Sequence, residues 1–378
     1  MRKVYLNNIP REEALQRFLE KAAIPRRTET VPVAEALGRV TAAPVFARLS
    51  MPGYHAAAMD GYAVRAESTF GASDQRPLRL APGDGYEAVD TGDPLPPGFD
   101  AVIKVEDVQP LEDGTIEILA PATPWQHVRP VGEDVVAGEL ILTAGQTLRP
   151  QDLGALLAGG VLELEVLARP RAVIIPTGSE IVPPEARRGK GDIPDFNSTV
   201  IAAYLQEWGA TATVYPIVRD DLEKITAAVK QAMAGGDLII VIAGSSAGRE
   251  DYTSRVIEDL GEVLLHGVAT RPGKPTILGL AQGKPVVGLP GYPVSAYMSL
   301  EWFVRPLLYR YRGQPLPQRE RLEAVLGRRI VSEMGLEEHL RMAIGFVGGR
   351  FVANPLARGA GITMSLVRAD GLLIIPEH

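Results

Sequence analysis

Between residues 171 and 311 the chain alternates short apolar runs with amphipathic segments, and no other feature constrains its fold as much. The runs RAVIIP (171–176) and DLIIVIAG (237–244) are almost entirely apolar, which is typical of strands buried on both faces. The segments between the runs have helical spacing, and NSTVIAAYLQEWG begins with the capping candidates Asn197 and Ser198. This alternation predicts an α/β fold with a doubly wound parallel sheet and helices on both faces.

The same pattern predicts where a ligand binds. In an open parallel sheet, ligands lie beyond the carboxyl ends of the strands. Small or acidic residues follow three of these ends, at 177–180 (TGSE), 220–221 (DD) and 244–246 (GSS). Asp220 and Asp251 come from adjacent strand ends, and a pair of carboxylates there suggests a magnesium ion, which prefers oxygen ligands and often accompanies phosphates.

The segment 244–295 carries most of the candidate binding residues. They are Gly244, Ser245, Ser246, Asp251, Arg271, Lys274, Lys284, Pro290 and Pro293. The Gly-Ser-Ser turn can cradle an anion, although it is not a P-loop because no Gly-Lys-Ser/Thr follows. The cations supply positive charge, and the proline-rich turn leads into a helix whose amino terminus can face an anion. Asp251 begins the next helix, so capping that helix is an alternative role for it.

Two turn-rich regions flank this part of the chain. Residues 48–140 alternate strand-like runs with turns such as PGDG and TGDP, which predicts a small β domain. Residues 316–378 contain further short strands and predict a second small β domain. Short helices are expected at 10–24, at 31–37 and at 150–160.

Three motifs of the first β region carry polar candidates. Asp60 lies in MPGYHAAAMDGYAVRA, and the alternative for it is a turn carboxylate that caps its own backbone. Thr91 can present its hydroxyl, next to the amide of Gly92, to an oxyanion, or it can belong to a rigid β connection. The planar guanidinium of Arg129 can donate two parallel hydrogen bonds to an oxyanion. Alternatively, Arg129 can form a surface salt bridge with Asp134.

One acidic candidate follows the first strand of the α/β region. Glu180 ends the TGSE turn, where Gly178 allows a ligand to approach the backbone. Its carboxylate can bind a ligand amine or a metal, and the alternative is a capping role.

Composition narrows the classes of function. The 378 residues are 46% apolar and 22% charged, which is ordinary for a globular protein, and the net charge of −7 argues against nucleic acid as a partner. The absence of cysteine excludes disulfides, thiolate metal sites and cysteine nucleophiles. No apolar run has the signal-peptide pattern or approaches the ~20 residues of a membrane helix, so we expect a cytoplasmic protein with no membrane contact.

Seven strings in order carry a family resemblance. They are MDGYAV, TGDPLPPG, VGEDV, TGSEI, SSAGREDYT, RPGKP and GLPGYPVSA. Together they resemble the molybdopterin molybdenumtransferases of the MoeA type, which are similar to the E domain of gephyrin. The strings extend over nearly the whole chain, and their order and spacing make the resemblance specific.

The resemblance implies a cytoplasmic homodimer of elongated, four-domain subunits. The domains would be a linker domain of 1–47 with 140–170, the turn-rich β domain 48–139, the α/β molybdopterin-binding domain 171–313, and the C-terminal β domain 314–378. Members of the family insert molybdate into adenylylated molybdopterin with magnesium and release AMP. Tungstate remains an alternative to molybdate, because both are tetrahedral dianions of similar size. The molybdopterin adenylyltransferase is an expected partner.

The resemblance also implies an active site shared between subunits. Carried over by motif position, one half would hold Asp60, Thr91, Arg129 and Asp134, and the other Glu180, Asp220, Asp251, Pro290 and Pro293. Asp220 and Asp251 would handle magnesium and the nucleotide phosphates. Glu180 would contact the pterin or the nucleotide, and Asp60 would act near the metal-transfer step.

The chain departs from the family pattern at three places. Gly267 and Arg271 stand where members have two lysines, and loss of the first charge bears on molybdate binding or turnover. The pair before Ser245 is Ala243-Gly244 rather than two glycines. The family's last domain continues with further strands past the position of His378.

Two alternatives to the transferase remain open. Gly267 motivates the first, a regulatory paralog that binds molybdopterin or molybdate without turnover. The second is a nucleotide hydrolase built on the same sheet, as in competence-damage-like proteins. The strings MDGYAV and TGDPLPPG argue against the hydrolase, because that family shares only the sheet domain.

Overall fold

The computed structural model describes residues 9–242 and 252–377, which form two compact units. One unit consists of Met1–Arg27 together with Ala168–His378, and the other of Thr28–Leu167.

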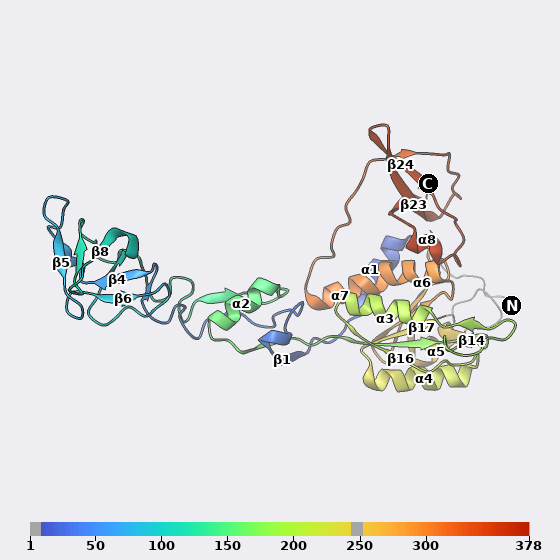
Figure 1. Ribbon diagram of the computed structural model, residues 1–378. Coiled ribbons are helices and arrows are strands. Elements are labelled where there is room, and N and C mark those ends of the chain that lie inside the picture. Colours follow the sequence, from blue (N-terminus) through green and yellow to red (C-terminus); the bar gives the residue numbers. More distant parts are fainter. Residues whose placement is uncertain (1–8, 243–251, 378) are drawn as a thin grey trace. The chain divides into compact units, whose positions relative to one another are not determined.

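The larger unit is built on a six-stranded sheet in the order β16-β13-β17-β21-β20-β18 (Figure 1). Its strands are β13 (Arg171–Pro176), β16 (Thr211–Val214), β17 (Leu238–Ile242), β18 (Gly261–His266), β20 (Ile277–Ala281) and β21 (Lys284–Leu289). The first four in the spatial order are parallel, whereas β20 and β18 are antiparallel to their neighbours. Strand β18 therefore runs in the same direction as the first four and only β20 is reversed, so the sheet is mixed and the prediction of a parallel sheet is wrong for β20.

The antiparallel pairing of β20 and β21 has a local cause. Ala281 pairs with Lys284, so only two residues connect the strands. These residues, Gln282 and Gly283, have φ angles of 49° and 79°, and two consecutive positive φ angles characterise the tight hairpin turns that match the twist of a sheet. So short a connection joins antiparallel strands only, because a parallel pair needs a long crossover.

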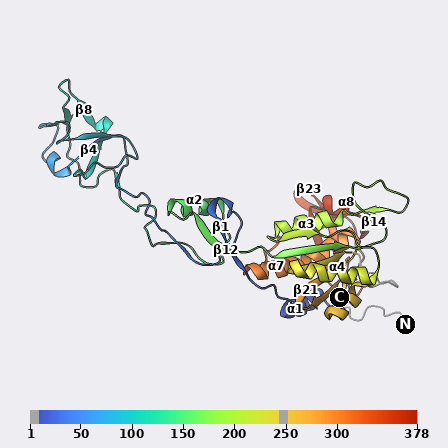
Figure 2. The same cartoon turned by 90° about the horizontal axis from the view of Figure 1, so that it is seen from below.

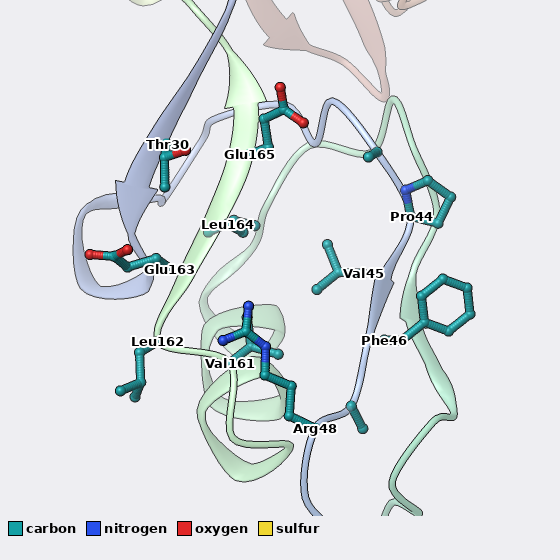
Figure 3. A pocket seen from close by; sticks show the side chains of 12 residues that line it. Thr30, Pro44, Val45, Phe46, Arg48, Val161, Leu162, Glu163, Leu164 and Glu165 are labelled. Carbon is teal, nitrogen blue, oxygen red and sulfur yellow. The ribbon is translucent and has the colours of Figure 1, made fainter.

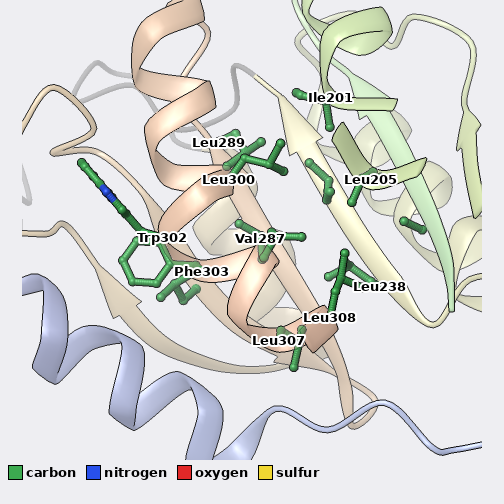
Figure 4. Packing of buried hydrophobic residues seen from close by; sticks show 14 of the residues in the cluster. Ile201, Leu205, Leu238, Val287, Leu289, Leu300, Trp302, Phe303, Leu307 and Leu308 are labelled. Carbon is green, nitrogen blue, oxygen red and sulfur yellow. The ribbon is translucent and has the colours of Figure 1, made fainter. Parts of the chain in front are cut away.

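Both faces of the sheet are buried. On β13, Ala172 and Ile174 pack into one hydrophobic cluster, while Val173 and Ile175 pack into another on the opposite face. Helices α3, α6 and α7 lie on the side of the first cluster and α4 on the side of the second (Figure 1). Figure 4 shows the first cluster, in which Val287 and Leu289 of β21 meet side chains of the helical segment that follows. Burial on both faces explains why the central strands are almost entirely apolar.

Helices of this unit largely match the predicted segments. They are α1 (Arg11–Lys21), α3 (Asn197–Glu207), α4 (Leu222–Gly235), α5 (Tyr252–Leu260), α6 (Pro293–Ser299) and α7 (Arg305–Arg312). Helix α1, which the expected division assigns to the linker domain, packs Ala14 and Phe18 into the first cluster. At the start of α3, the capping acceptor is the carboxylate of Asp195, 3.1 Å from the amide of Ser198, rather than Asn197 or Ser198.

A π-helical segment (Leu300–Val304) interrupts the expected single helix at 294–310. Pro306 follows it at the beginning of α7. Proline has no N–H to donate, and its ring clashes with the carbonyl four residues earlier, so the regular α-helical hydrogen bonding cannot continue through it.

A second sheet of this unit has the order β19-β23-β24-β22, and β25 also pairs with β23. Its elements are β19 (Thr270–Arg271), β22 (Val325–Leu326), β23 (Glu337–Val347), β24 (Arg350–Pro355) and β25 (Gly371–Ile375), with helix α8 (Met364–Val367). Leu340, Met342 and Ala353 form its small core. The short parallel pair β14 (Ile181–Val182) and β15 (Ile193–Pro194) stands apart from both sheets.

The smaller unit contains three β regions. In the first, β1 (Thr28–Pro32) pairs with β12 (Glu163–Leu167), and β2 (Val45–Phe46) pairs with β11 (Leu140–Leu142). Helix α2 (Pro150–Ala158) and a 3₁₀ turn (Val33–Glu35) accompany them. The predicted helix at 31–37 is thus only this 3₁₀ turn, because residues up to Pro32 are in β1. Buried apolar residues such as Val33, Leu148 and Leu156 form the core of this region.

Two three-stranded sheets form the other two β regions, together with a short two-stranded ladder. The strands are β3 (Ala56–Ala57), β4 (Gly61–Val64), β5 (Leu78–Leu80), β6 (Glu87–Val89), β7 (Ala101–Lys104), β8 (Val108–Pro110), β9 (Ile116–Ile118) and β10 (Val128–Arg129), with 3₁₀ turns at Ala66–Thr69 and Val105–Asp107. Strand β4 lies between β6 and β7, β9 lies between β5 and β8, and β3 pairs with β10. At Gly61 a Cβ atom would lie 2.0 Å from the carbonyl oxygen of Ile103, so this strand crossing excludes any side chain.

Asp237 organises the amino end of the central sheet. Its side chain is 4% exposed and accepts hydrogen bonds from Arg27 at 2.5 and 2.8 Å and from the amide and side chain of Arg171. Burial raises the pKa of the Asp237 carboxyl, but the two arginines outweigh burial and hold the pKa well below its usual range. The ionised form is therefore the one that stabilises the fold.

We expect Asp237→Asn to lower the free energy of unfolding by about 1–3 kcal/mol at pH 7, because charge-assisted bonds to two arginines are lost. A carboxyl with a depressed pKa in the folded state stabilises above its unfolded pKa of about 3.9, and this stabilisation disappears as the pH falls through the folded pKa. Urea unfolding at pH 7 and pH 3 should show a smaller difference from wild type at pH 3. Asp259→Asn, on the exposed face of α5, is the control, and equal losses in the two variants would contradict the assignment.

Candidate active site

Pairing registers place several loops at one edge of the central sheet. Pro176 of β13 pairs with Ile242 of β17, which pairs with Leu289 of β21. On the other side of β21, Gly288 pairs with Ile277, which pairs with His266. The carboxyl ends of β13, β17 and β21 and the connection 267–276 between β18 and β20 therefore lie at the same edge of the sheet, which we call the carboxyl edge.

Ser179 and Asp220 meet at the carboxyl edge. The Asp220 carboxylate accepts a hydrogen bond from the Ser179 amide at 2.9 Å. The parallel bridge between Thr177 and Val218 continues the sheet to this point and explains the contact. Glu180 follows directly, so two of the predicted acidic residues, Glu180 and Asp220, come from neighbouring loops.

Gly178 makes this loop geometry possible. Its φ angle is 145°, and a Cβ atom there would lie 2.5 Å from Ile181 and 3.1 Å from the Glu180 carboxylate. Only glycine adopts this backbone conformation readily, so the residue fixes the path of the chain beside both acidic residues.

The turn after β21 is tied to two other segments. The Asn197 side chain of α3 donates a hydrogen bond to the carbonyl of Gly291 at 2.8 Å. The amide of Val294, in the first turn of α6, donates to the carbonyl of Ala360 at 3.0 Å. Pro290 is buried and Pro293 is half-buried, which gives the turn a fixed shape. A loop of the C-terminal sheet region thus borders the predicted turn.

The predicted cations have different surroundings. Arg271 and Lys274 lie in the 267–276 connection at the carboxyl edge, and the Arg271 guanidinium forms an ion pair with Glu333 at 2.9 Å. Lys284 begins β21 and is at the opposite edge, where its ammonium donates to the carbonyls of Met233 and Gly236 at 2.6 and 2.8 Å. The expectation that Lys284 contributes to the anion site is wrong, because it caps the carboxyl end of α4.

Arg341 is a contributor that the sequence analysis missed. It is 2% exposed and donates to the carbonyls of Ala357 at 2.9 Å and His339 at 3.2 Å, and to the hydroxyl of Ser365 at 3.2 Å. These bonds hold the loop that meets Val294. An arginine followed by apolar residues in a strand gave no sequence signal for this role.

In the smaller unit, Asp60 and Thr91 are brought together. The Asp60 carboxylate accepts hydrogen bonds from the hydroxyl of Thr91 at 2.7 Å and from its amide at 2.6 Å. The hydroxyl and then the amide of Thr91 lower the pKa of Asp60, which is fully exposed. The position of the Asp60 carboxylate is therefore fixed by a residue 31 positions away.

Arg129 and Asp134 lie near this pair along the same ladder. Strand β3, only three residues before Asp60, pairs with β10 so that Ala56 lies opposite Arg129. The Arg129 side chain bonds to Glu133 at 2.5 Å rather than to Asp134. The amide of Asp134 donates to the carbonyl of Met51 at 3.0 Å. Three motifs that are distant in sequence thus converge in one part of the unit.

Four predicted residues lie outside the described residues: Gly244, Ser245, Ser246 and Asp251. Within residues 9–242 and 252–377, no group of three or more histidine, aspartate or glutamate side chains is arranged to hold a metal ion. In the same ranges, no helix has both the length and the apolarity needed to cross a membrane.

A separate pocket of about 730 Å³ lies in the smaller unit. Figure 3 shows Val45 and Phe46 on one wall and Leu162 and Leu164 on the other. The charged residues that line it are Arg48, Glu163 and Glu165. None of the predicted site residues lines it.

α/β proteins with an open sheet bind ligands beyond the carboxyl ends of their strands. Acidic loops and a constrained turn at this edge place the chain in that class. Three regions of the chain match families: residues 9–160 the MoeA N-terminal region (domain I and II), residues 173–310 a probable molybdopterin binding domain, and residues 323–378 the MoeA C-terminal region (domain IV). The chain belongs to the MoeA family.

Individual relatives agree with this assignment. Molybdopterin molybdenumtransferase 2 of Mycobacterium tuberculosis is 35% identical over 96% of this chain and 94% of its own length. The molybdopterin molybdenumtransferase of Synechococcus elongatus is 33% identical over 78% of each chain. The crystal structure of a molybdopterin biosynthesis MoeA protein from Pyrococcus horikoshii superposes with a TM-score of 0.82 at 34% identity, over 98% of this chain and 95% of that one.

We expect Thr91→Val to raise the pKa of Asp60 toward its ordinary value, because the hydroxyl donor is lost while the backbone amide remains. Carbon-detected NMR titration of labelled aspartate carboxyls measures this change directly. Thr91→Ser keeps the hydroxyl and should titrate like the wild type. An unchanged Asp60 titration in the valine variant would contradict the contact.

We expect Gly178→Ala to destabilise the larger unit by about 1–3 kcal/mol, because alanine is strained at this φ and its methyl group collides with Ile181. Thermal unfolding measures the loss. Gly235→Ala, in α4 with nothing within 4 Å of the added Cβ and no positive φ, is the matched control. The control should be neutral or slightly stabilising, and equal behaviour of the two variants would refute the steric argument.

Proposed function

We propose that this protein is a molybdopterin molybdenumtransferase of molybdenum cofactor biosynthesis, which inserts molybdate into adenylylated molybdopterin and releases AMP. The observation that carries the proposal is the similarity, over almost the whole chain, to transferases that bear this name. Matches to all three MoeA regions in order support it. The reaction would take place in the cytoplasm, with adenylylated molybdopterin supplied by the adenylyltransferase.

The proposed site has two halves. Glu180, Asp220, Asp251, Pro290 and Pro293 form the half at the carboxyl edge, with Gly244, Ser245, Ser246, Arg271 and Lys274 as further binding residues. Asp60, Thr91, Arg129 and Asp134 form the half in the smaller unit. We propose that a homodimer completes the site, with each half contributed by a different subunit. The four-domain division and the doubly wound description of the α/β domain belong to the same proposal.

The chemistry of this site would be positioning and electrostatics rather than covalent catalysis. Asp60, held in position by the Thr91 hydroxyl, offers a fixed acceptor for a group that carries protons or positive charge. Asp220 has one carboxylate oxygen bonded to the Ser179 amide, and its other oxygen is a suitable donor for magnesium. Magnesium held by Asp220 and Asp251 would neutralise phosphate charge.

A binding protein without turnover is the alternative function. Gly267 removes one cation of the family pattern, and Arg271 is paired with Glu333. Both observations lower the positive charge available to stabilise oxyanions at the carboxyl edge. Measuring AMP release together with binding of the adduct separates binding from turnover.

Purified protein is mixed with adenylylated molybdopterin, molybdate and magnesium, and released AMP is measured by chromatography. We expect AMP release by the wild type and its loss in Asp251→Ala, whose melting temperature should change little. Tight binding of the adduct without AMP release by the wild type would favour the regulatory alternative. Retained turnover with the loss of about 1 kcal/mol expected for a missing helix cap would instead show that Asp251 caps α5.

A further inference from the structure

The connection between β14 and β15 carries three exposed cations. Arg187, Arg188 and Lys190 lie within four residues, and no ion pair or hydrogen bond of their side chains occurs among the described residues. The turn itself is ordered by an acid, since the Asp192 carboxylate accepts a hydrogen bond from the Gly189 amide at 2.7 Å. The loop also contains Glu185 and Asp192, so three cations and two acids give it a formal net charge of +1, and the three cations are exposed to solvent.

Both ends of this loop are fixed at the carboxyl edge. Strand β14 follows Glu180 directly, and β15 leads to Asp195 at the beginning of α3. The amide of Ile193 donates to the carbonyl of Glu180, and the amide of Asp195 to that of Val182, both at 2.9 Å. The loop extends from β14 away from the central sheet in Figures 1 and 2.

The acidic residues at the carboxyl edge would hinder the approach of an anionic substrate, and the loop cations could offset this repulsion. Its described acidic residues include Glu180, Asp195 and Asp220, and the chain as a whole has a net charge of −7. A substrate with a pyrophosphate group would be repelled by this charge before any contact forms. Arg271 offsets little of it, because its guanidinium is already paired with Glu333.

We propose that Arg187, Arg188 and Lys190 form a cationic arm that captures the phosphate-bearing substrate by long-range attraction and raises its concentration at the carboxyl edge. The inference rests on the proposed function and names the anionic part of that substrate as the recognised group. Attraction by clustered charges raises association rates about 10- to 1,000-fold and weakens with salt over a Debye length of about 10 Å at 0.1 M. The arm acts on encounter, so the chemical step does not depend on it.

The test compares association of adenylylated molybdopterin with the wild type and with the triple variant R187A/R188A/K190A. Stopped-flow pterin fluorescence gives the association and dissociation rate constants at low and high ionic strength. We expect the variant to associate about tenfold more slowly at low salt, with dissociation and kcat unchanged. The difference should shrink as salt is added.

Two controls make the test specific. The variant K230A/R321A/R329A removes three exposed cations from α4 and from the segment before β23, and it should associate like the wild type. The swap R187K/R188K/K190R keeps the charge and should also associate normally. The cationic-arm proposal would be overturned by any of three results. These are equal slowing in the K230A/R321A/R329A control, slowing in the lysine–arginine swap, and normal association of the R187A/R188A/K190A variant.

AMP release by the wild type tests the proposed transferase function independently of the association rates. Binding without AMP release would refute the transferase activity while the association rates still test the arm. A wild type that does not bind the adduct would overturn both.

Discussion

Burial of the central strands on both faces is the constraint on which the functional part of this molecule depends. Side chains of β13 and β17 point alternately into two hydrophobic clusters, so the strands have no solvent-facing side on which to carry polar groups. Polar chemistry is thereby confined to the positions where the strands end. The pairing registers align these strand ends. As a consequence, the contact between Ser179 and Asp220 and the turn after β21 lie at one edge of the sheet.

The same constraint explains how far the sequence predicts the fold. RAVIIP and LIIVI have no plausible place other than the interior of a sheet, and β13 and β17 are found there. The mixed character of the sheet depends instead on a turn of two residues, Gln282 and Gly283, whose positive φ angles force a hairpin. An apolar run contains no information on strand direction, and the expectation of a parallel sheet is wrong for β20 alone.

Site residues differ in predictability for a related reason. Glycine and acidic residues at strand ends, such as Gly178 and Asp220, are unusual enough to be recognised one at a time. Arg341 was missed because its role depends on the carbonyls it meets after folding, and those come from a loop sixteen residues away. The contact between Asp60 and Thr91 is of the same kind, since each residue alone resembles an ordinary turn.

The type of a residue does not reveal its electrostatic effect, and the cations of this protein show this most clearly. Arg271, Lys284 and the cations of the 183–192 loop are indistinguishable by composition, yet each has a different electrostatic effect. Lys284 satisfies the end of a helix at the opposite edge, and Arg271 is offset by Glu333, so neither leaves a full positive charge at the carboxyl edge. The loop cations have no described partner, and their charge reaches into solvent. Because exposed charges act on a ligand before contact whereas paired ones act only within the folded protein, the distribution of ion pairs, rather than the number of cations, determines how this edge meets an anion.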